Sequence, residues 1–373
     1  MLKYFTIIVL FFLFISCYSS DFEERLNKGK VEYDQLDEIS GLVFGRTNKD
    51  IIWAVNDGRA DEIYGIDRNG KSLTYLNFSK DILPIDTDIE DIATIRYNGA
   101  NYIVLADIGD NNSSRENINL FFIPEIKYSG SAEIKIDDNL ILQFSIKYED
   151  GSRDAECLFV DPNSNKIYIV TKRESRARLY EISSDFNVNN VNTAKFVSDF
   201  DFGNNISSGS TGVTAGDISS DGQHILIRDY TSVWYFENTS LNLKESLKAK
   251  PKVVESYNYS INEEPQGESI AWDSDISGFY TVSEEKSFDN FEADLFFFKR
   301  KLSSVKKKNE LIFINGDIFN NTSKSIYLKF YNILGQMTYS SALQPNESLN
   351  IKVLNIKAQY LLYDNKFYKI TID

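Results

Sequence analysis

Residues 154–173 read DAECLFVDPNSNKIYIVTKR, two apolar segments joined by a polar turn, with Glu156 near the start. Short apolar runs bounded by Asp, Asn and Ser are strand signals, so this stretch predicts a β-hairpin. The phrase recurs along the chain at intervals of roughly 50 to 65 residues, which is typical of a repeat architecture. Its five copies are DEISGLVF with Glu38, DIEDIATI with Glu90, DAECLFVD with Glu156, AGDISSDG with Asp217 and GESIAWDS with Glu268.

Each copy is followed by further strand signals. Second strands are predicted at 51–57, 101–107, 166–172, 224–229 and 278–284, and third strands near 62, 118, 177, 231 and 293. Fourth strands are predicted at 71–79, 133–148, 194–202 and 252–260, but the last unit lacks one. Residues 30–33 can fill that vacancy and close a ring, which removes an exposed edge. The sequence therefore predicts an all-β, five-bladed β-propeller over residues 28–302, with a six-bladed ring as the alternative.

The repeated acid is a candidate metal ligand. The first strand of each propeller blade lines the central channel, so equivalent positions converge on one mouth of it. Carboxylates brought together repel one another, and a hard cation with oxygen ligands would relieve that repulsion. We therefore expect a Ca²⁺ site formed by Glu38, Glu90, Glu156, Asp217 and Glu268. The alternative is that these acids cap strands or bond neighbouring backbone N–H groups.

A second polar set ends the second strands and differs in charge from unit to unit, as a binding pocket would. We expect a substrate to contact Asp57, Asp110, Arg115, Lys172, Arg173 and Arg228. Cationic residues mixed with carboxylates suit an anionic group that is bound beside a cation. The candidates for catalysis are Asp57, Asp107, Lys172, Arg228 and Glu284. The alternative is that the set consists of ordinary surface turns rich in Asp, Asn and Gly.

Composition excludes several kinds of chemistry. The chain has one histidine, His224, and no G-x-S-x-G motif, so a Ser-His-Asp device and a zinc site with several His ligands are excluded. Neither a P-loop nor a dinucleotide fingerprint occurs. The net charge of −15 argues against a nucleic-acid partner. Any catalysis must use carboxylates, Lys, Arg, Tyr and a metal-activated water.

The N-terminus has the features of an export signal. Lys3 is followed by an apolar run over 5–15, which is too short to span a bilayer. The segment 13–17 reads LFISC and resembles a bacterial lipobox, in which Cys17 would be lipidated. We therefore expect an exported outer-membrane or cell-surface lipoprotein, touching the membrane only through Cys17, or a secreted protein if residues 1–17 are simply cleaved. Cys157, within CLFV, is expected to be a buried, inert thiol.

The repeat region resembles a group of secreted bacterial β-propellers whose blades carry phrases such as IWAVNDG, LADIGDN, DAECLFVDP, IYIVTKR, EPQGESIAW and FYTVSE. This resemblance implies the fold but no particular activity. The architecture is more distantly similar to calcium-dependent apyrases and to propeller lactonases. Those resemblances imply a metal at the channel mouth, and any enzymatic activity inferred from them rests on fold-level analogy.

Composition changes again at residues 303–309, a polar and basic linker. Residues 310–373 alternate in short strands, and IYLKFYNILGQMTYSS in particular resembles the sorting domain of the type IX secretion system of Bacteroidetes. Two departures are the missing Asn-Pro near the domain start and Ala358-Gln359 before Tyr360, where a Gly is usual. The alternative is a small β-sandwich-like domain without a special role.

Two functions follow from these observations. The first is a Ca²⁺-dependent hydrolase of a phosphorylated or ester substrate, exported to the cell envelope. The second is a non-catalytic surface module that binds a glycan or a protein. In both cases we expect a monomer whose ligand is a small anion or a glycan.

Overall fold

The computed structural model describes residues 21–203, 212–238, 242–285 and 291–301. Beyond these it describes 311–314, 317–320, 324–332, 334–345, 347–350, 360–363 and 366–369. The predicted export signal, the lipidation site at Cys17 and the linker at 303–309 lie outside the described residues. The chain folds as two compact units that divide after Lys301. No helix among the described residues is long and apolar enough to cross a membrane.

The first unit consists of mostly antiparallel sheets that follow one another in chain order. One sheet is formed by β2 (Ile39–Phe44), β3 (Ile52–Asn56), β4 (Glu62–Ile66) and β5 (Ser72–Asn77). The next two sets are β6 (Ile89–Tyr97), β7 (Ala100–Asp107), β8 (Ile118–Pro124) and β10 (Leu142–Tyr148), then β11 (Ala155–Val160), β12 (Ile167–Thr171), β13 (Ala177–Ile182) and β14 (Asn192–Phe200). These two sets form one eight-stranded sheet, because β10 and β14 pair in parallel.

The remaining sheets of this unit have four strands each. One contains β15 (Val213–Ile218), β16 (His224–Asp229), β17 (Val233–Glu237) and β18 (Lys252–Val253). The other contains β19 (Gly267–Trp272), β20 (Gly278–Ser283), β21 (Asp294–Lys299) and β1 (Leu26–Lys30). Short helical turns connect strands, namely η1 (Lys80–Ile82), η2 (Asp138–Leu140) and α1 (Leu243–Ser246).

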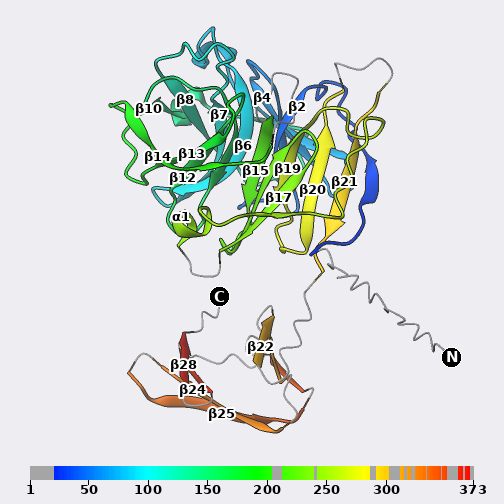
Figure 1. Ribbon diagram of the computed structural model, residues 1–373, viewed down its shortest axis with the longest axis vertical. Helices are drawn as coiled ribbons and strands as arrows, with labels where there is room; N and C mark the ends of the chain where they lie inside the picture. The colour runs from blue at the N-terminus through cyan, green and yellow to red at the C-terminus, as the bar shows by residue number, and fades with distance from the viewer. Residues whose placement is uncertain are drawn as a thin grey trace, which may run out of the picture. The chain divides into compact units, whose positions relative to one another are not determined.

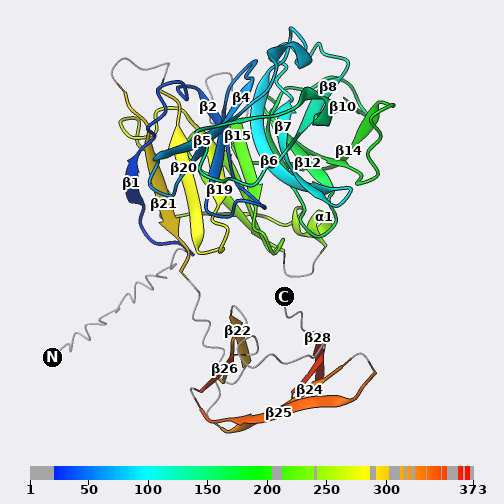
Figure 2. The same cartoon turned by 180° about the vertical axis from the view of Figure 1, so that it is seen from behind.

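The inner strands of the sheets form a closed cycle. β2 contacts β6, β6 contacts β11, β11 contacts β15, β15 contacts β19, and β19 returns to β2. Figures 1 and 2 show β6, β15 and β19 in the middle of this unit, with β10 and β14 at one edge and β21 at the other. A cycle of sheets whose first strands face a common axis is the arrangement of a β-propeller.

The apolar residues explain why the inner strands occupy the middle. β2, β11, β15 and β19 are buried along their whole length, as expected for strands that pack on both faces. A separate apolar cluster fills each interface between neighbouring sheets, including one that joins β20 and β21 to β2 and β4. Burial between sheets, rather than within one central core, therefore holds the cycle together.

Three strands differ from the prediction. The fourth strand predicted at 252–260 is limited to β18, Lys252–Val253, which pairs with β17. The strand that completes the last sheet is Leu26–Lys30, which pairs with β21, so it precedes the predicted segment 30–33. The predicted strand 133–148 divides into β9 (Glu133–Lys135) and β10, and β9 pairs in parallel with β5 of the preceding sheet. The turn at η2, where the Asp137 side chain accepts a hydrogen bond from the Asn139 N–H, separates the two strands.

The second unit is also all-β. One sheet contains β22 (Leu311–Ile314), β23 (Asp317–Asn320) and β26 (Ser348–Asn350). The other contains β24 (Ile326–Tyr331), β25 (Met337–Leu343), β27 (Tyr360–Tyr363) and β28 (Lys366–Lys369). Ile326, Leu328 and Phe330 alternate with exposed residues along β24 and pack into the unit's apolar cluster, as a half-buried strand requires.

Candidate cation site at the start of the inner strands

Each inner strand of the first unit carries a β-bulge directly after its first residue. The pairing register with the second strand skips one residue in every sheet. A bulge re-aims the side chain of the extra residue, and bulges are common next to functional sites. The five bulge positions are Ser40, Glu90, Glu156, Thr214 and Glu268.

The bulges show which repeated acids are structurally equivalent. Glu90, Glu156 and Glu268 occupy bulge positions and are 5–7% exposed. Glu38 lies two residues before the bulge at Ser40, so it corresponds to Asp88 and Asp154 in the next two units. The prediction of five equivalent acids therefore does not hold, because sequence similarity aligned Glu38 and Asp217 to the wrong register.

Asp217 has a different role from the bulge acids. It lies three residues after the bulge at Thr214, and its carboxylate accepts hydrogen bonds from the backbone N–H of Ile218 at 2.8 Å and of Trp272 at 2.7 Å. Asp91 does the same for Ile92 and Leu158, at 2.8 and 2.7 Å. Both acids link one inner strand to the next through backbone N–H groups. For Asp217 this is the role predicted as the alternative to metal binding.

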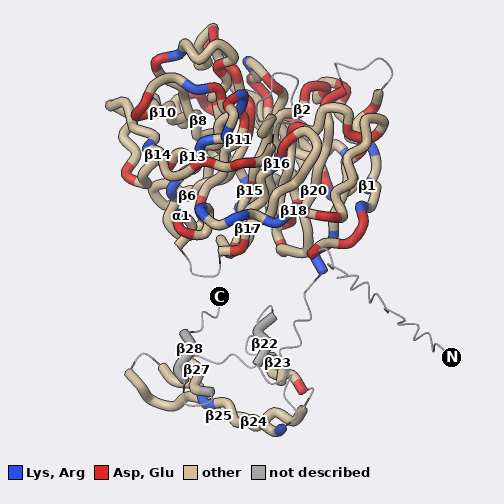
Figure 3. The backbone as a smooth tube through the Cα atoms, viewed as in Figure 1, with Lys and Arg blue, Asp and Glu red and all other residues tan. Residues whose placement is uncertain are grey.

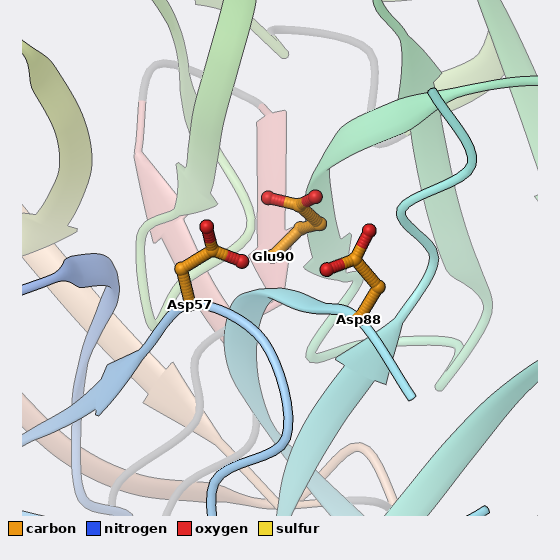
Figure 4. Close-up of side chains that lie close together, drawn as sticks. All are labelled: Asp57, Asp88 and Glu90. Atoms are coloured by element: carbon orange, nitrogen blue, oxygen red, sulfur yellow. The ribbon is translucent and has the colours of Figure 1, made fainter. Parts of the chain in front are cut away.

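Three carboxylates converge where β3 ends and β6 begins. Single oxygens of Asp57, Asp88 and Glu90 lie within 4.8 Å of one another. Figure 4 shows these side chains pointing toward a common space, with Asp57 directly after β3, Asp88 directly before β6 and Glu90 within β6. The Oδ1 atom of Asp57 is buried and has no hydrogen-bond partner among the described residues. An unsatisfied buried carboxylate oxygen is costly, so this space favours an occupant that carries positive charge.

The backbone at Gly109 makes room for two of these carboxylates. A Cβ atom on Gly109 would lie 2.4 Å from Asp88 Oδ2 and 2.4 Å from Glu90 Oε1. The Gly109 N–H donates to the Asp88 carbonyl at 3.2 Å, which fixes the approach. In two other sheets the equivalent N–H belongs to a residue with a side chain: the Asp57 N–H donates to the Glu38 carbonyl, and the Lys172 N–H donates to the Asp154 carbonyl. Glycine at 109 therefore keeps a cradle open beside Asp88 and Glu90.

Burial and mutual repulsion raise the pKa values of these acids. Desolvation, followed by the charges of Asp88, Glu268 and Glu38, raises the pKa of Asp57 to about 7. Desolvation and Glu156 raise the pKa of Glu90 well above its usual range. Desolvation together with a hydrogen bond to Glu268 raises the pKa of Glu284 to about 10. The acids therefore hold protons near neutral pH unless a cation replaces them.

Lys172 neutralises the opposite side of the cluster. Its Nζ donates to the Glu156 carboxylate and, at 2.7 Å, to the Tyr230 hydroxyl. Tyr230 in turn donates to Glu268 Oε1 at 3.1 Å. Burial alone would lower the pKa of Lys172, but Glu156, Tyr230 and Glu268 together outweigh it and raise that pKa above its usual range. Glu156 and Glu268 are thus satisfied by protein groups, whereas Asp57, Asp88 and Glu90 face no contacting cation among the described residues.

The other predicted ligand-binding residues are engaged in the scaffold. Arg115 Nη2 contacts Asp107 at 2.7 Å, and Asp107 also accepts the Asp88 N–H at 2.8 Å. Asp110 accepts the N–H groups of Ser114 and Arg115, which shapes its own loop. Arg173 Nε contacts Asp154 at 2.6 Å. These pairs organise the rim and leave little charge for a ligand.

Arg228 is not available to a ligand. It is fully buried and contacts Glu264 at 2.8 Å, Tyr257 OH at 2.6 Å and the carbonyl oxygen of Ser269 at 2.8 Å. Gly267 makes room for it, because a Cβ atom there would lie 1.6 Å from Arg228 Nη2. The assignment of Arg228 to substrate binding or catalysis conflicts with this burial, since both of its terminal nitrogens donate to protein groups.

Two residues of the site were missed in the sequence. Asp88 supplies one of the three converging carboxylates, and Tyr230 links Lys172 to Glu268. The signal for Asp88 is an acid two positions before the bulge acid, as in Asp88-Ile89-Glu90 and Asp154-Ala155-Glu156. No comparable signal marks Tyr230, whose position only the fold reveals.

No protein-family model matches the chain, and no curated protein matches it in sequence. Among solved structures, a luciferin-regenerating enzyme aligns with 75% of this chain and 95% of its own at 11% identity and a TM-score of 0.40. A putative 6-phosphogluconolactonase of Bacteroides uniformis aligns with 83% and 86% of the two chains at 12% identity and a TM-score of 0.35. PorZ, a surface component of the type IX secretion system of Porphyromonas gingivalis, aligns with 89% of this chain and 44% of its own at 10% identity and a TM-score of 0.35. Similarities this distant carry no argument about function, so the function must be argued from the site.

Proposed function

We propose that this chain is an exported, five-bladed β-propeller that binds Ca²⁺ between Asp57, Asp88 and Glu90. In this view the eight-stranded sheet consists of two blades joined where β10 pairs with β14. The observation that carries the cation site is the convergence of three carboxylates, one with a buried and unpartnered oxygen. Oxygen-only ligands suit a hard cation such as Ca²⁺. Glu156 and Glu268 would lie in the surrounding shell.

We further propose that the site hydrolyses a phosphorylated or ester substrate. A bound divalent cation would neutralise charge and polarise a substrate oxygen. The chain's own contribution would come from Glu284, which is buried beside Glu268 and can hold a proton at neutral pH. Lys172 would keep Glu156 in place through its direct contact. Export to the cell envelope, a lipid anchor at Cys17 and a sorting role for residues 310–373 remain proposals from sequence.

The second candidate function is a binding module without catalysis. It is favoured by the ion pairs of Lys172, Arg173 and Arg115, which leave no unpaired cation among these three to orient an anionic substrate. A screen of an aryl phosphate, an aryl ester and a lactone separates the two functions. Turnover that requires Ca²⁺ and disappears in Glu90→Gln supports the hydrolase. Calcium binding without turnover of any substrate supports the module.

Calcium is expected to stabilise the protein. After chelation, adding Ca²⁺ at a hundred times its Kd should raise the free energy of unfolding by about 2.7 kcal/mol, because only the native state assembles the site. The measurement is thermal unfolding of the full chain with and without Ca²⁺. Glu90→Gln should abolish the shift, whereas Glu133→Gln, on the exposed strand β9, should retain it. An unchanged melting temperature in the wild type would overturn the cation site.

Replacing Gly109 by alanine is expected to weaken Ca²⁺ binding by about tenfold or more. The added Cβ would displace the Asp88 and Glu90 carboxylates, and a ligand shift of this size disrupts coordination. Calorimetric titration measures the affinity. Gly151→Ala is the matched control, because a Cβ at Gly151 meets nothing within 4 Å, although its φ of +102° means some loss of stability is expected. Equal Ca²⁺ affinity in Gly109→Ala and wild type would show that the cradle is not part of the site.

A further inference from the structure

A polar cavity lies at the end of the inner strands opposite the acid cluster. It has a volume of about 310 Å³ and is lined by residues at the ends of all five inner strands, including Phe44, Val160, Ile218 and Trp272. The acid cluster lies at the beginnings of the same strands. The two sites therefore occupy different ends of the axis and can be tested independently.

Three cations surround this cavity, namely Arg46, Lys49 and Arg96. None of them forms an ion pair with any residue that the structure describes. In the first unit Lys and Arg positions lie scattered among Asp and Glu positions (Figure 3), and most of the other arginines form ion pairs, as Arg68, Arg153 and Arg178 do. An unpaired cluster of positive charge beside a cavity is the electrostatic signature of an anion site.

The acids near the cavity are already engaged. The Asp217 carboxylate accepts the N–H groups of Ile218 and Trp272. Asp273 accepts hydrogen bonds from Arg68 at 2.9 Å and from Ser277. Glu125 accepts the backbone N–H groups of residues 46–48 at 2.8–3.0 Å. Each of these acids therefore supports the walls of the cavity. Asp217, Glu125 and Asp161 attract Arg46 electrostatically, but none of them forms an ion pair with it.

Arg46 is held in place before any ligand arrives. Its Nε donates to Thr94 Oγ1 at 3.1 Å and its Nη2 to the Thr94 carbonyl at 3.2 Å. A guanidinium has five N–H groups, and no other hydrogen bond links this side chain to the described residues. Glu125 can approach the backbone of residues 46–48 because residue 45 is glycine: a Cβ atom on Gly45 would lie 2.3 Å from Glu125 Oε1. The remaining donors are thus pre-organised for a carboxylate or phosphate.

One part of the cavity wall is apolar, and a buried hydrogen-bond donor without a partner lies beside it. Val43, Ala93, Val160 and Ile218 line it beside the charged groups. Trp272 also lines it, and its buried indole Nε1 has no hydrogen-bond partner among the described residues. We propose that this cavity binds a small organic anion, with its carboxylate or phosphate on Arg46 and Arg96 and its apolar body against Ile218 and Trp272.

Binding of phenyl phosphate, benzoate and neutral phenol to the full chain tests the proposal. Calorimetry should show both anions binding at least about tenfold more tightly than phenol, because charged hydrogen bonds supply the difference. The indole N–H signal of Trp272 is assigned by its disappearance in Trp272→Phe. In the nitrogen-15 spectrum of the wild type this signal should shift on addition of phenyl phosphate. Inorganic phosphate should bind more weakly than phenyl phosphate, since it lacks the apolar body.

Variants locate the anion. Arg46→Met and Arg96→Met should each weaken phenyl phosphate binding by about tenfold, while Arg176→Met, which removes an exposed arginine paired with Asp199, should not. Arg46→Lys keeps a charge if Arg46→Met fails to fold, and should show an intermediate loss. These titrations are made with a chelator present, so that binding of phenyl phosphate through Ca²⁺ at the acid cluster does not contribute. Equal binding of phenol, no shift at Trp272, or full affinity in both methionine variants would overturn the proposal.

Discussion

Replacing Glu264 by glutamine is expected to lower the free energy of unfolding by about 3–5 kcal/mol. Glu264 is 1% exposed and Arg228 is fully buried, with 2.8 Å between Oε1 and Nη2. Removing one member of a buried pair leaves the other charge without compensation in a medium of low polarity. Urea unfolding of the single variant, followed by circular dichroism, measures the loss.

The matched control is the exposed pair Arg176–Asp199, whose side chains are 50% and 41% accessible. Asp199→Asn should cost less than about 1 kcal/mol, because solvent screens surface pairs. The double variant Arg228→Met with Glu264→Gln should recover part of the loss, since no isolated charge remains. A loss below 1 kcal/mol in Glu264→Gln would contradict the structural role of the pair and reopen Arg228 as a ligand-binding residue.

The strand order follows from the sequence because local signals agree with the tertiary arrangement. Apolar runs bounded by turn residues give the positions of β2, β7, β12 and β20 closely. Most residues of these strands are buried, and burial fixes the register of a strand. The completing strand lies at Leu26–Lys30 rather than at the predicted 30–33. Its sequence, LNKGK, has no apolar pattern by which it could be located. It forms through backbone pairing with β21, which no side-chain signal reports.

The candidate site could be predicted only in part. The repeated phrase locates Glu90, Glu156 and Glu268 at the bulges because that position recurs from unit to unit, and their role as metal ligands stays a prediction. Asp217 was misplaced, since similarity between short phrases cannot distinguish a bulge from the residue three places later. Arg228 was misjudged because its burial depends on Glu264 and Tyr257, which lie outside the repeated phrase. Such pairings arise from packing between neighbouring sheets.

The calcium-free protein is expected to lose stability as pH rises from 5 to 8. In the native state the pKa of Asp57 is about 7, because of burial and the charge of Asp88, whereas an unfolded aspartate has a pKa near 3.9. Between these values the native state binds more protons than the unfolded state, so unfolding becomes easier as pH rises. Each pKa unit is worth about 1.4 kcal/mol, so ionising Asp57 costs at most about 4 kcal/mol.

The difference between wild type and Asp57→Asn isolates this effect. Desolvation lowers the pKa of buried His224 to about 4, so this residue makes the native state more stable as pH rises through the ordinary histidine range. That effect opposes the trend, and it is present in both proteins. Urea midpoints are measured in a chelator at pH 5, 6, 7 and 8. The midpoint of Asp57→Asn should increase relative to that of the wild type with each rise in pH. Adding Ca²⁺ should remove that gain, because the cation replaces the proton and stabilises only the wild-type site. A constant difference across this range would show that Asp57 ionises normally, and a buried oxygen that ionises without cost would no longer call for a cation.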